Sequence, residues 1–195
     1  MTASNPHAND LRASILASVM RLITRNGYYN ITDESVAREA GLSVQELGKF
    51  YPSFAQLLAA SFGYQLDLWE QERNAEIQKR DGKISAEDYV ELLWNGMFRQ
   101  PEYVASLELL MGARGDLELR EAMEQQKDRL LKFRNGVREF IGHSDQTEEE
   151  RSALVSKVVA LLRGLSIQNM VTPEKRRFHD DLVRGLSNSG GISPF

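Results

Sequence analysis

The spacing of apolar residues is the feature that most constrains this chain, because they recur every three or four positions through nearly its whole length. In the first segment, the residues that share one helical face are Leu11, Ile15, Val19, Leu22 and Ile23. The sequence contains no sustained alternation of apolar and polar residues, which a half-buried strand requires. It therefore predicts an all-α protein.

Capping residues set the predicted helix boundaries. Ser43, Ser53 and Thr147 each precede a Glu or Gln by three positions, which is the spacing of a capping box. Pro52 and Pro173 lie at the edges of helices, where proline is tolerated. About nine helices are predicted, at residues 9–26, 33–40, 44–50, 54–79, 85–99, 101–113, 116–141, 147–170 and 173–187.

Composition narrows the class of protein. The 195 residues, 42% of them hydrophobic, suffice for one or two small globular domains. No cysteine is present, which excludes disulfides, thiolate metal sites and thiol nucleophiles. The polar first ten residues and the short apolar runs predict neither an export signal nor a membrane span, and hence a cytoplasmic protein. A net charge of −4 argues against sequence-independent coating of nucleic acid, so any DNA contact must be local.

The segment 33–52 has the residues that a helix-turn-helix needs. Ala37 is a small residue at the point where two helices touch, Gly41 supplies the positive φ of the turn, and Ser43 caps the second helix. An inward apolar face is predicted for Val36, Ala40, Leu42, Leu47 and Phe50. An ordinary helical hairpin also favours a glycine in its turn, but it does not require all these residues in one register. The pattern therefore favours DNA-binding geometry.

Several stretches in this order resemble the tetracycline-repressor (TetR) family of bacterial transcription regulators. They are "ILASVMRLITRNGYYNIT", "VAREAGLS" and "FYPSFAQLLAA", which together cover about residues 11–60, and the later "LLRGLSIQ". The resemblance implies a helix-turn-helix domain at residues 9–53 and a helical ligand-binding and dimerisation domain at 54–188. The segments 1–8 and 189–195 are expected to be disordered. The resemblance also implies a homodimer that represses transcription at a palindromic DNA operator and responds to a small-molecule effector.

On this reading, the face of the second helix opposite Leu47 and Phe50 points toward DNA. Gln45 is the best candidate to read a base, because its amide can pair bidentately with adenine, whereas Lys49 is suited to a phosphate. Thr32 and Ser43 offer hydroxyl groups to phosphate, or act only as helix caps. The complete set of predicted DNA contacts is Thr32, Ser43, Val44, Gln45, Glu46, Gly48 and Lys49.

The sequence departs from the family pattern at three positions. Gln45 stands where the family usually has Gly, Gly48 where it has an aromatic residue, and Phe54 where it has Lys. In addition, residues 1–55 contain five basic and five acidic residues, so this domain is formally neutral. A second hypothesis therefore stays open, namely a dimer of the same fold that senses a ligand or binds a protein partner and has weak or lost DNA binding.

Bulky, adaptable side chains concentrate in the larger domain, where the resemblance implies an effector pocket. Either they pack as core or they line a pocket that admits an apolar or aromatic molecule. The residues in question are Tyr64, Trp69, Tyr89, Trp94, Met97, Phe98, Tyr103, Met111, Met123 and Phe133.

Two C-terminal helices carry apolar stripes suited to a symmetric four-helix interface between two copies of the chain. Packing within one chain is the alternative. The predicted interface comprises Leu154, Val158, Leu161, Gly164, Leu165, Phe178, Leu182 and Leu186.

An enzyme finds little support in the sequence. His7, His143 and His179 are far apart and match no metal-ligand spacing, and no glycine-rich phosphate loop or nucleophile elbow occurs. The sequence thus predicts neither a metal nor a cofactor, and favours a ligand-responsive regulator over a catalyst.

Overall fold

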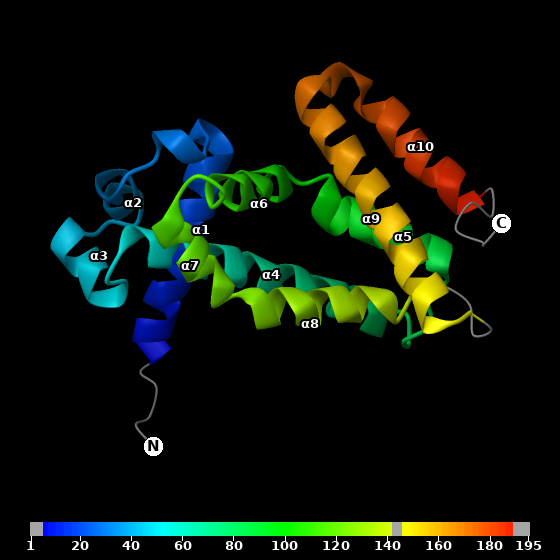
Figure 1. The fold of residues 1–195 in the computed structure, drawn as a ribbon, viewed down its shortest axis with the longest axis horizontal. Helices are drawn as coiled ribbons and strands as arrows, with labels where there is room; N and C mark the ends of the chain where they lie inside the picture. Colours follow the sequence, from blue (N-terminus) through cyan, green and yellow to red (C-terminus); the bar gives the residue numbers. More distant parts are fainter. Residues whose placement is uncertain (1–5, 142–145, 189–195) are drawn as a thin grey trace. The chain divides into compact units, whose positions relative to one another are not determined.

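The computed structural model describes residues 6–141 and 146–188, and is entirely helical over those ranges (Figure 1). This confirms the all-α prediction. The described helices are α1 (Pro6–Asn26), α2 (Asp33–Glu39), α3 (Val44–Phe50), α4 (Phe54–Gln78), α5 (Ala86–Leu93), α6 (Pro101–Gly112), α7 (Leu117–Glu124), α8 (Lys127–Arg138), α9 (Glu148–Val171) and α10 (Arg176–Asn188). A π-helical turn, η2 (Trp94–Phe98), follows α5, and short 3-10 turns lie at Tyr28–Asn30 (η1) and Pro173–Lys175 (η3).

The helix starts follow the capping residues. At α3 the Ser43 hydroxyl accepts the Glu46 backbone N–H at 3.2 Å, and the Glu46 carboxylate accepts the Ser43 N–H at 2.8 Å. Thr147 and Glu150 make the same reciprocal pair at α9. The first helix begins earlier than predicted, at Pro6, because proline is well suited to the first position of a helix. Of the two segments expected to be disordered, residues 1–5 and 189–195 lie outside the described residues. Residues 6–8 belong to α1, so the expectation was wrong for them.

Two predicted helices are interrupted. The segment 116–141 divides into α7 and α8, where the N–H groups of Gln125 and Gln126 bond three residues back, to Ala122 and Met123. No Gly or Pro marks this break, and the buried residues on either side keep helical spacing, so periodicity alone predicts one helix. The segment 85–99 likewise changes from α-helix to π-helix at Trp94.

The chain divides into two compact units, each built from two stretches of sequence. The first comprises residues 1–68 and 105–130, and the second 69–104 and 131–195. These units do not coincide with the predicted division at residue 53 into a DNA-binding and a ligand-binding domain, which stays a prediction; the first unit also contains 54–68 and 105–130.

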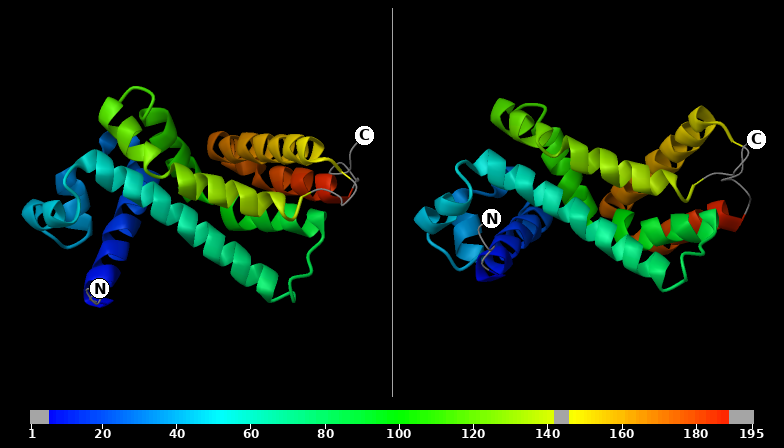
Figure 2. Two further views of the ribbon diagram at one scale, coloured as in Figure 1. Left: turned by 60° about the horizontal axis from the view of Figure 1, so that its bottom comes forward. Right: turned by 90° about the horizontal axis from the view of Figure 1, so that it is seen from below.

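Each unit has its own apolar core. In the first, α1 contributes Ile15, Val19 and Ile23, which are at most 1% exposed, and these lie with Val36 of α2 and Leu47 of α3 among the buried side chains. In the second, α5 packs on α10, and α9 and α10 form an antiparallel hairpin seen in Figure 1 and in the left view of Figure 2. The largest buried side chains of the second unit include Trp94, Tyr89, Ile141 and Leu162.

Candidate nucleic-acid interface and ligand cavity

The turn between α2 and α3 is a helix-terminating Schellman motif. Gly41 has φ 70°, its N–H donates to Arg38 O at 3.2 Å, and the Leu42 N–H donates to Ala37 O at 2.8 Å. Helices α2 and α3 are in contact, and Ala37 and Leu47 are both buried, at 2% and 3% exposure. The local sequence thus builds the helix-turn-helix geometry.

Helix α3 turns its predicted reading face to solvent. Val44, Gln45, Glu46, Gly48 and Lys49 are exposed, while the neighbouring Leu47 is buried. Ala40, Leu42 and Phe50, expected on the inward face, are half-buried.

The polar side chains on this face differ in what they already bind. The Glu46 carboxylate accepts the Ser43 N–H and hydroxyl, at 2.8 and 2.7 Å, and these hydrogen bonds lower the pKa of Glu46. Within the described ranges, Gln45 and Lys49 make neither a hydrogen bond nor an ion pair through their side chains. Gln45 and Lys49 are therefore the polar side chains of α3 whose hydrogen-bonding groups are unused, although the charge of Lys49 also contributes to the lowered pKa of Glu46.

Of the five basic residues in segment 1–55, three are engaged within the protein. Arg25 Nη2 lies 2.7 Å from Glu39 Oε2, and Arg21 Nε lies 3.4 Å from Glu39 Oε1. The hydrogen bond from Arg25, followed by that from Arg21, lowers the pKa of Glu39. The Arg12 guanidinium lies over the Phe50 ring, 5.3 Å from its centroid, at the end of α3.

The N-terminus of α2 is also capped from within. The Ser35 N–H donates to the Thr32 hydroxyl at 3.3 Å, and the Thr32 N–H donates to Ser35 Oγ at 2.9 Å. Asp33 and Glu34 stand in the first turn, and burial raises the pKa of Asp33. Carboxylates at a helix N-terminus interact favourably with its dipole, so this end of α2 is less suited to phosphate than that of α3.

A contact absent from the sequence predictions joins the helix-turn-helix to α6. The Glu108 carboxylate accepts the Tyr28 backbone N–H at 2.6 Å, across 80 positions of sequence. The Tyr28 ring also lies on Gly112, where a Cβ would stand 2.5 Å from the ring carbon Cε1. In the sequence, the one signal that the Tyr28 ring approaches α6 closely is the glycine at position 112, inside a helical pattern.

The second unit contains a cavity of about 390 Å³ between α4, α5, the π-helical turn and α8. Of the ten residues predicted to line a pocket, Trp69, Met97 and Phe133 do so. The other lining residues are Glu72, Arg73, Ala75, Glu76, Lys79, Leu92, Leu93 and Gly96.

The remaining predicted pocket residues lie elsewhere. Tyr89, Trp94, Phe98 and Tyr103 are buried in the core of the second unit. Tyr64, Met111 and Met123 belong to the first unit, where Met111 is 65% exposed.

The two buried tyrosines hold neighbouring elements through their hydroxyl groups. The Tyr103 hydroxyl accepts from Arg163 Nε at 2.9 Å, and the Tyr89 hydroxyl donates to Gly136 O at 3.4 Å. Burial raises the pKa of Tyr89 to about 12, so it is a neutral donor at physiological pH.

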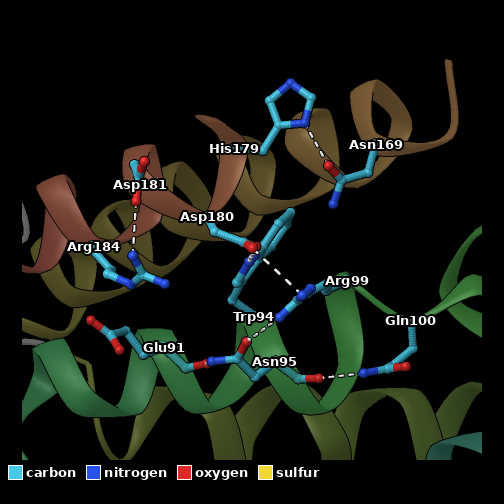
Figure 3. A network of polar contacts seen from close by, with 10 residues as sticks. All are labelled: Glu91, Trp94, Asn95, Arg99, Gln100, Asn169, His179, Asp180, Asp181 and Arg184. Atoms are coloured by element: carbon cyan, nitrogen blue, oxygen red, sulfur yellow. Dashed lines mark hydrogen bonds and ion pairs between the residues drawn. The ribbon is translucent and has the colours of Figure 1, made fainter. Parts of the chain in front are cut away.

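The π-helical turn connects the cavity wall to α10 (Figure 3). Trp94 Nε1 donates to Asp180 Oδ1 at 2.9 Å, and Arg99 Nη2 lies 3.5 Å from Asp180 Oδ2. Arg99 also donates to Asn95 Oδ1 at 3.2 Å. Met97 of the same turn lines the cavity, so the π-helical turn contacts both the cavity and α10.

Helices α9 and α10 leave an apolar face exposed. Among the predicted interface residues, Leu161, Phe178 and Leu182 are 41%, 59% and 42% exposed, and Gly164 is open. Leu154 and Leu165 are instead buried, at 9% and 7% exposure, and Val158 is half-buried. The Leu186 side chain lies outside the described residues. The sequence predictions missed the exposed Ile167, Met170 and Val171.

This exposed face also explains why α9 is so apolar. In length and mean hydropathy, 1.3 over its most apolar window, α9 meets the criteria of a membrane-spanning helix, and 33% of that window is buried in the protein. A single helix of this length and composition is weak evidence for a membrane span.

No group of three or more His, Cys, Asp or Glu that would suit a metal ion occurs in the described part of the chain.

Comparison with known proteins identifies the fold. No protein-family model and no curated protein sequence matches the chain. A transcriptional regulator from Saccharomonospora viridis, in complex with choline, is 22% identical with a TM-score of 0.70, over 93% of this chain and 95% of that one. A TetR transcriptional regulator from Legionella pneumophila is 15% identical with a TM-score of 0.69, over 97% and 98%.

A third similar structure is the transcriptional regulator FadR from Bacillus subtilis, in complex with stearoyl-CoA. It is 16% identical to this chain, with a TM-score of 0.65 over 91% of this chain and 97% of that one. The chain therefore has the fold of TetR-type transcriptional regulators along nearly its whole length.

Proposed function

We propose that this protein is a DNA-binding transcriptional regulator, a cytoplasmic homodimer that represses from a palindromic operator until a small molecule binds it. The observation that carries the proposal is the exposed face of α3. It presents Gln45 and Lys49, whose side chains make no hydrogen bond or ion pair in the described part of the chain, directly after a capped helix N-terminus. A fold shared with transcriptional regulators supports the same reading.

In this proposal α3 enters the major groove. Gln45 reads one base pair and Lys49 holds a phosphate, whereas the Ser43 N–H and hydroxyl reach a phosphate only by leaving the Glu46 carboxylate. Val44 and Gly48 line the same face, and Glu46 fixes the start of the helix through Ser43. Thr32 contributes a phosphate contact from α2, beside the acidic first turn of that helix.

The dimer is needed because one α3 reads only one half-site, and half-sites lie about 34 Å apart, one helical turn of DNA. We assign the interface to the exposed face of α9 and α10. Leu161, Phe178 and Leu182 supply apolar contact, and Gly164 lets two helices approach closely. An effector in the cavity would release DNA only through unequal affinity for the two arrangements of the dimer. Residues 9–53 and 54–188 are the proposed DNA-binding and effector-binding portions.

The first experiment selects binding sites from random duplex DNA at low salt. We expect enrichment of a palindrome. Gln45→Ala should relax preference at one base pair by about 1–3 kcal/mol, and Lys49→Ala should weaken binding to all sequences and reduce the salt slope by about one. Lys83→Ala, which removes an exposed lysine of the second unit, is the charge-matched control and should leave the slope unchanged.

A second function has its own support. Arg12, Arg21 and Arg25 are engaged within the protein, which leaves few cations for phosphate. If selection enriches no sequence even at low salt, the protein is a ligand-sensing or protein-binding dimer of the same fold.

Sedimentation tests the dimer separately, and a monomer at micromolar concentration would contradict it.

A further inference from the structure

Arg73 is the buried charge of the cavity wall. It lies on α4, its side chain is 6% exposed, and its guanidinium lies over the Phe133 ring, 5.2 Å from the centroid. Gly136 makes room for it, because a Cβ there would stand 2.6 Å from Arg73 Nη2. The fold therefore places a permanent cation at a site from which water is largely removed.

Two partners of Arg73 are distant for a buried charge, because its Nε lies 3.3 Å from Asn74 Oδ1 and its Nη1 lies 3.4 Å from Phe133 O. Its guanidinium also donates a hydrogen bond to the uncharged Tyr89 hydroxyl. Charge-assisted hydrogen bonds are normally about 2.7–2.9 Å long. The nearest carboxylate, Glu70, stands 3.8 Å from Nη2 and is closer to Lys132, at 3.1 Å. The Arg73 guanidinium thus retains capacity for an anion.

The other charged groups of the cavity are less well placed to attract a ligand. Glu72 is an exposed side chain, so solvent screens its charge. Glu76 is paired with Lys79, which directly follows α4, and the hydrogen bond from Lys79 lowers the pKa of Glu76. Trp69, Leu93 and Met97 supply apolar wall. A buried guanidinium beside an apolar surface suits a molecule with a carboxylate at one end and a hydrocarbon or aromatic body.

We infer that the cavity binds an apolar carboxylate, whose anionic group pairs with Arg73 and whose body lies against Trp69, Leu93 and Met97. The inference rests on the ligand-sensing part of the proposed function and not on DNA binding. About 390 Å³ falls in the usual range of small-molecule sites and limits the ligand to a modest size. Arg73 therefore determines the charge that the effector must carry.

Calorimetric titration of the intact protein, without DNA, tests this inference. The probes are decanoate, decan-1-ol and decyltrimethylammonium, which share a ten-carbon chain and are respectively anionic, neutral and cationic. Naphthoate and its neutral carboxamide repeat the test with an aromatic body. We expect each carboxylate to bind about 10- to 100-fold more tightly than its neutral counterpart, and the cation to bind most weakly. Equal affinity across charges, preference for the cation, or no binding by either carboxylate would overturn the inference.

Two variants assign the preference to a residue. Arg73→Met should remove it, whereas Lys79→Met, which removes an exposed cation from the same wall, should change decanoate affinity less than threefold. Equal losses in both variants would indicate general electrostatic attraction and overturn the assignment. If Arg73→Met does not fold by circular dichroism, the wild-type probe series decides alone. Operator selection on the same preparation separates a failure of this inference from a failure of the regulator proposal.

Discussion

Gly48→Ala offers a sharp test of how the reading helix is used. Gly48 lies inside α3, is exposed, and has no heavy atom within 4 Å of the position that a Cβ would take. A methyl group there meets open space, so the expected change in the free protein is the helix-propensity difference between Gly and Ala. This is about 0.8–1.0 kcal/mol of added stability, or roughly 2–4 °C in Tm for a protein of this size.

For the protein bound to DNA, we expect Gly48→Ala to be unfavourable. If α3 enters the major groove with Gly48 against the DNA, the added methyl group occupies space that the duplex needs. We expect operator affinity to fall at least about tenfold, which corresponds to 1.4 kcal/mol. Urea denaturation of the free protein and titration of the selected operator therefore give results of opposite sign for one substitution.

Each measurement can refute a separate step. Lower stability of the Gly48→Ala protein would show that α3 is not an open helix at this position. Unchanged operator affinity, in a variant that is more stable, would show that Gly48 does not approach the DNA. Gln56→Ala, which places an alanine at an exposed position of α4 outside the predicted reading face, is the control and should leave operator affinity unchanged.

The remaining predictions concern the second unit. Trp94→Phe should lower the free energy of unfolding by about 1–3 kcal/mol in urea denaturation, because it removes the donor to the Asp180 carboxylate; unaltered stability would contradict this role. Tyr89 has a folded pKa of about 12 and an unfolded value near 10, so the unfolded chain loses this proton first and stability should decline as the pH rises from 10 to 12. Over that interval Tyr89→Phe should lose less stability than wild type, and parallel pH curves for the two proteins would refute the assignment. Gly164→Ala adds a methyl group on the exposed face of α9; we expect at least about tenfold weaker dimerisation by sedimentation, and an unchanged dimer would place the interface elsewhere.

The sequence alone determined what depends on neighbours within a few positions. Ser43 with Glu46, and Thr147 with Glu150, were recognisable as helix starts because a capping box closes across three residues. Gly41 was recognisable as the turn because its positive φ is a local requirement. The exposed face of α3 followed from helical spacing once Leu47 was assigned to the core.

Tertiary structure decided what depends on residues distant in sequence. Periodicity placed Leu161 and Leu165 of α9 on one apolar stripe, but packing buries Leu165 and leaves Leu161 41% exposed. Periodicity could not locate the cavity either, because Arg73 and Phe133 are sixty positions apart. In the sequence, Arg73 looks like an ordinary solvated residue and Phe133 like an ordinary core residue. A count of charges also does not reveal that Arg25 pairs with Glu39. Local hydrogen bonds and side-chain periodicity are written along the chain, whereas burial, pairing and empty space arise only when distant segments meet.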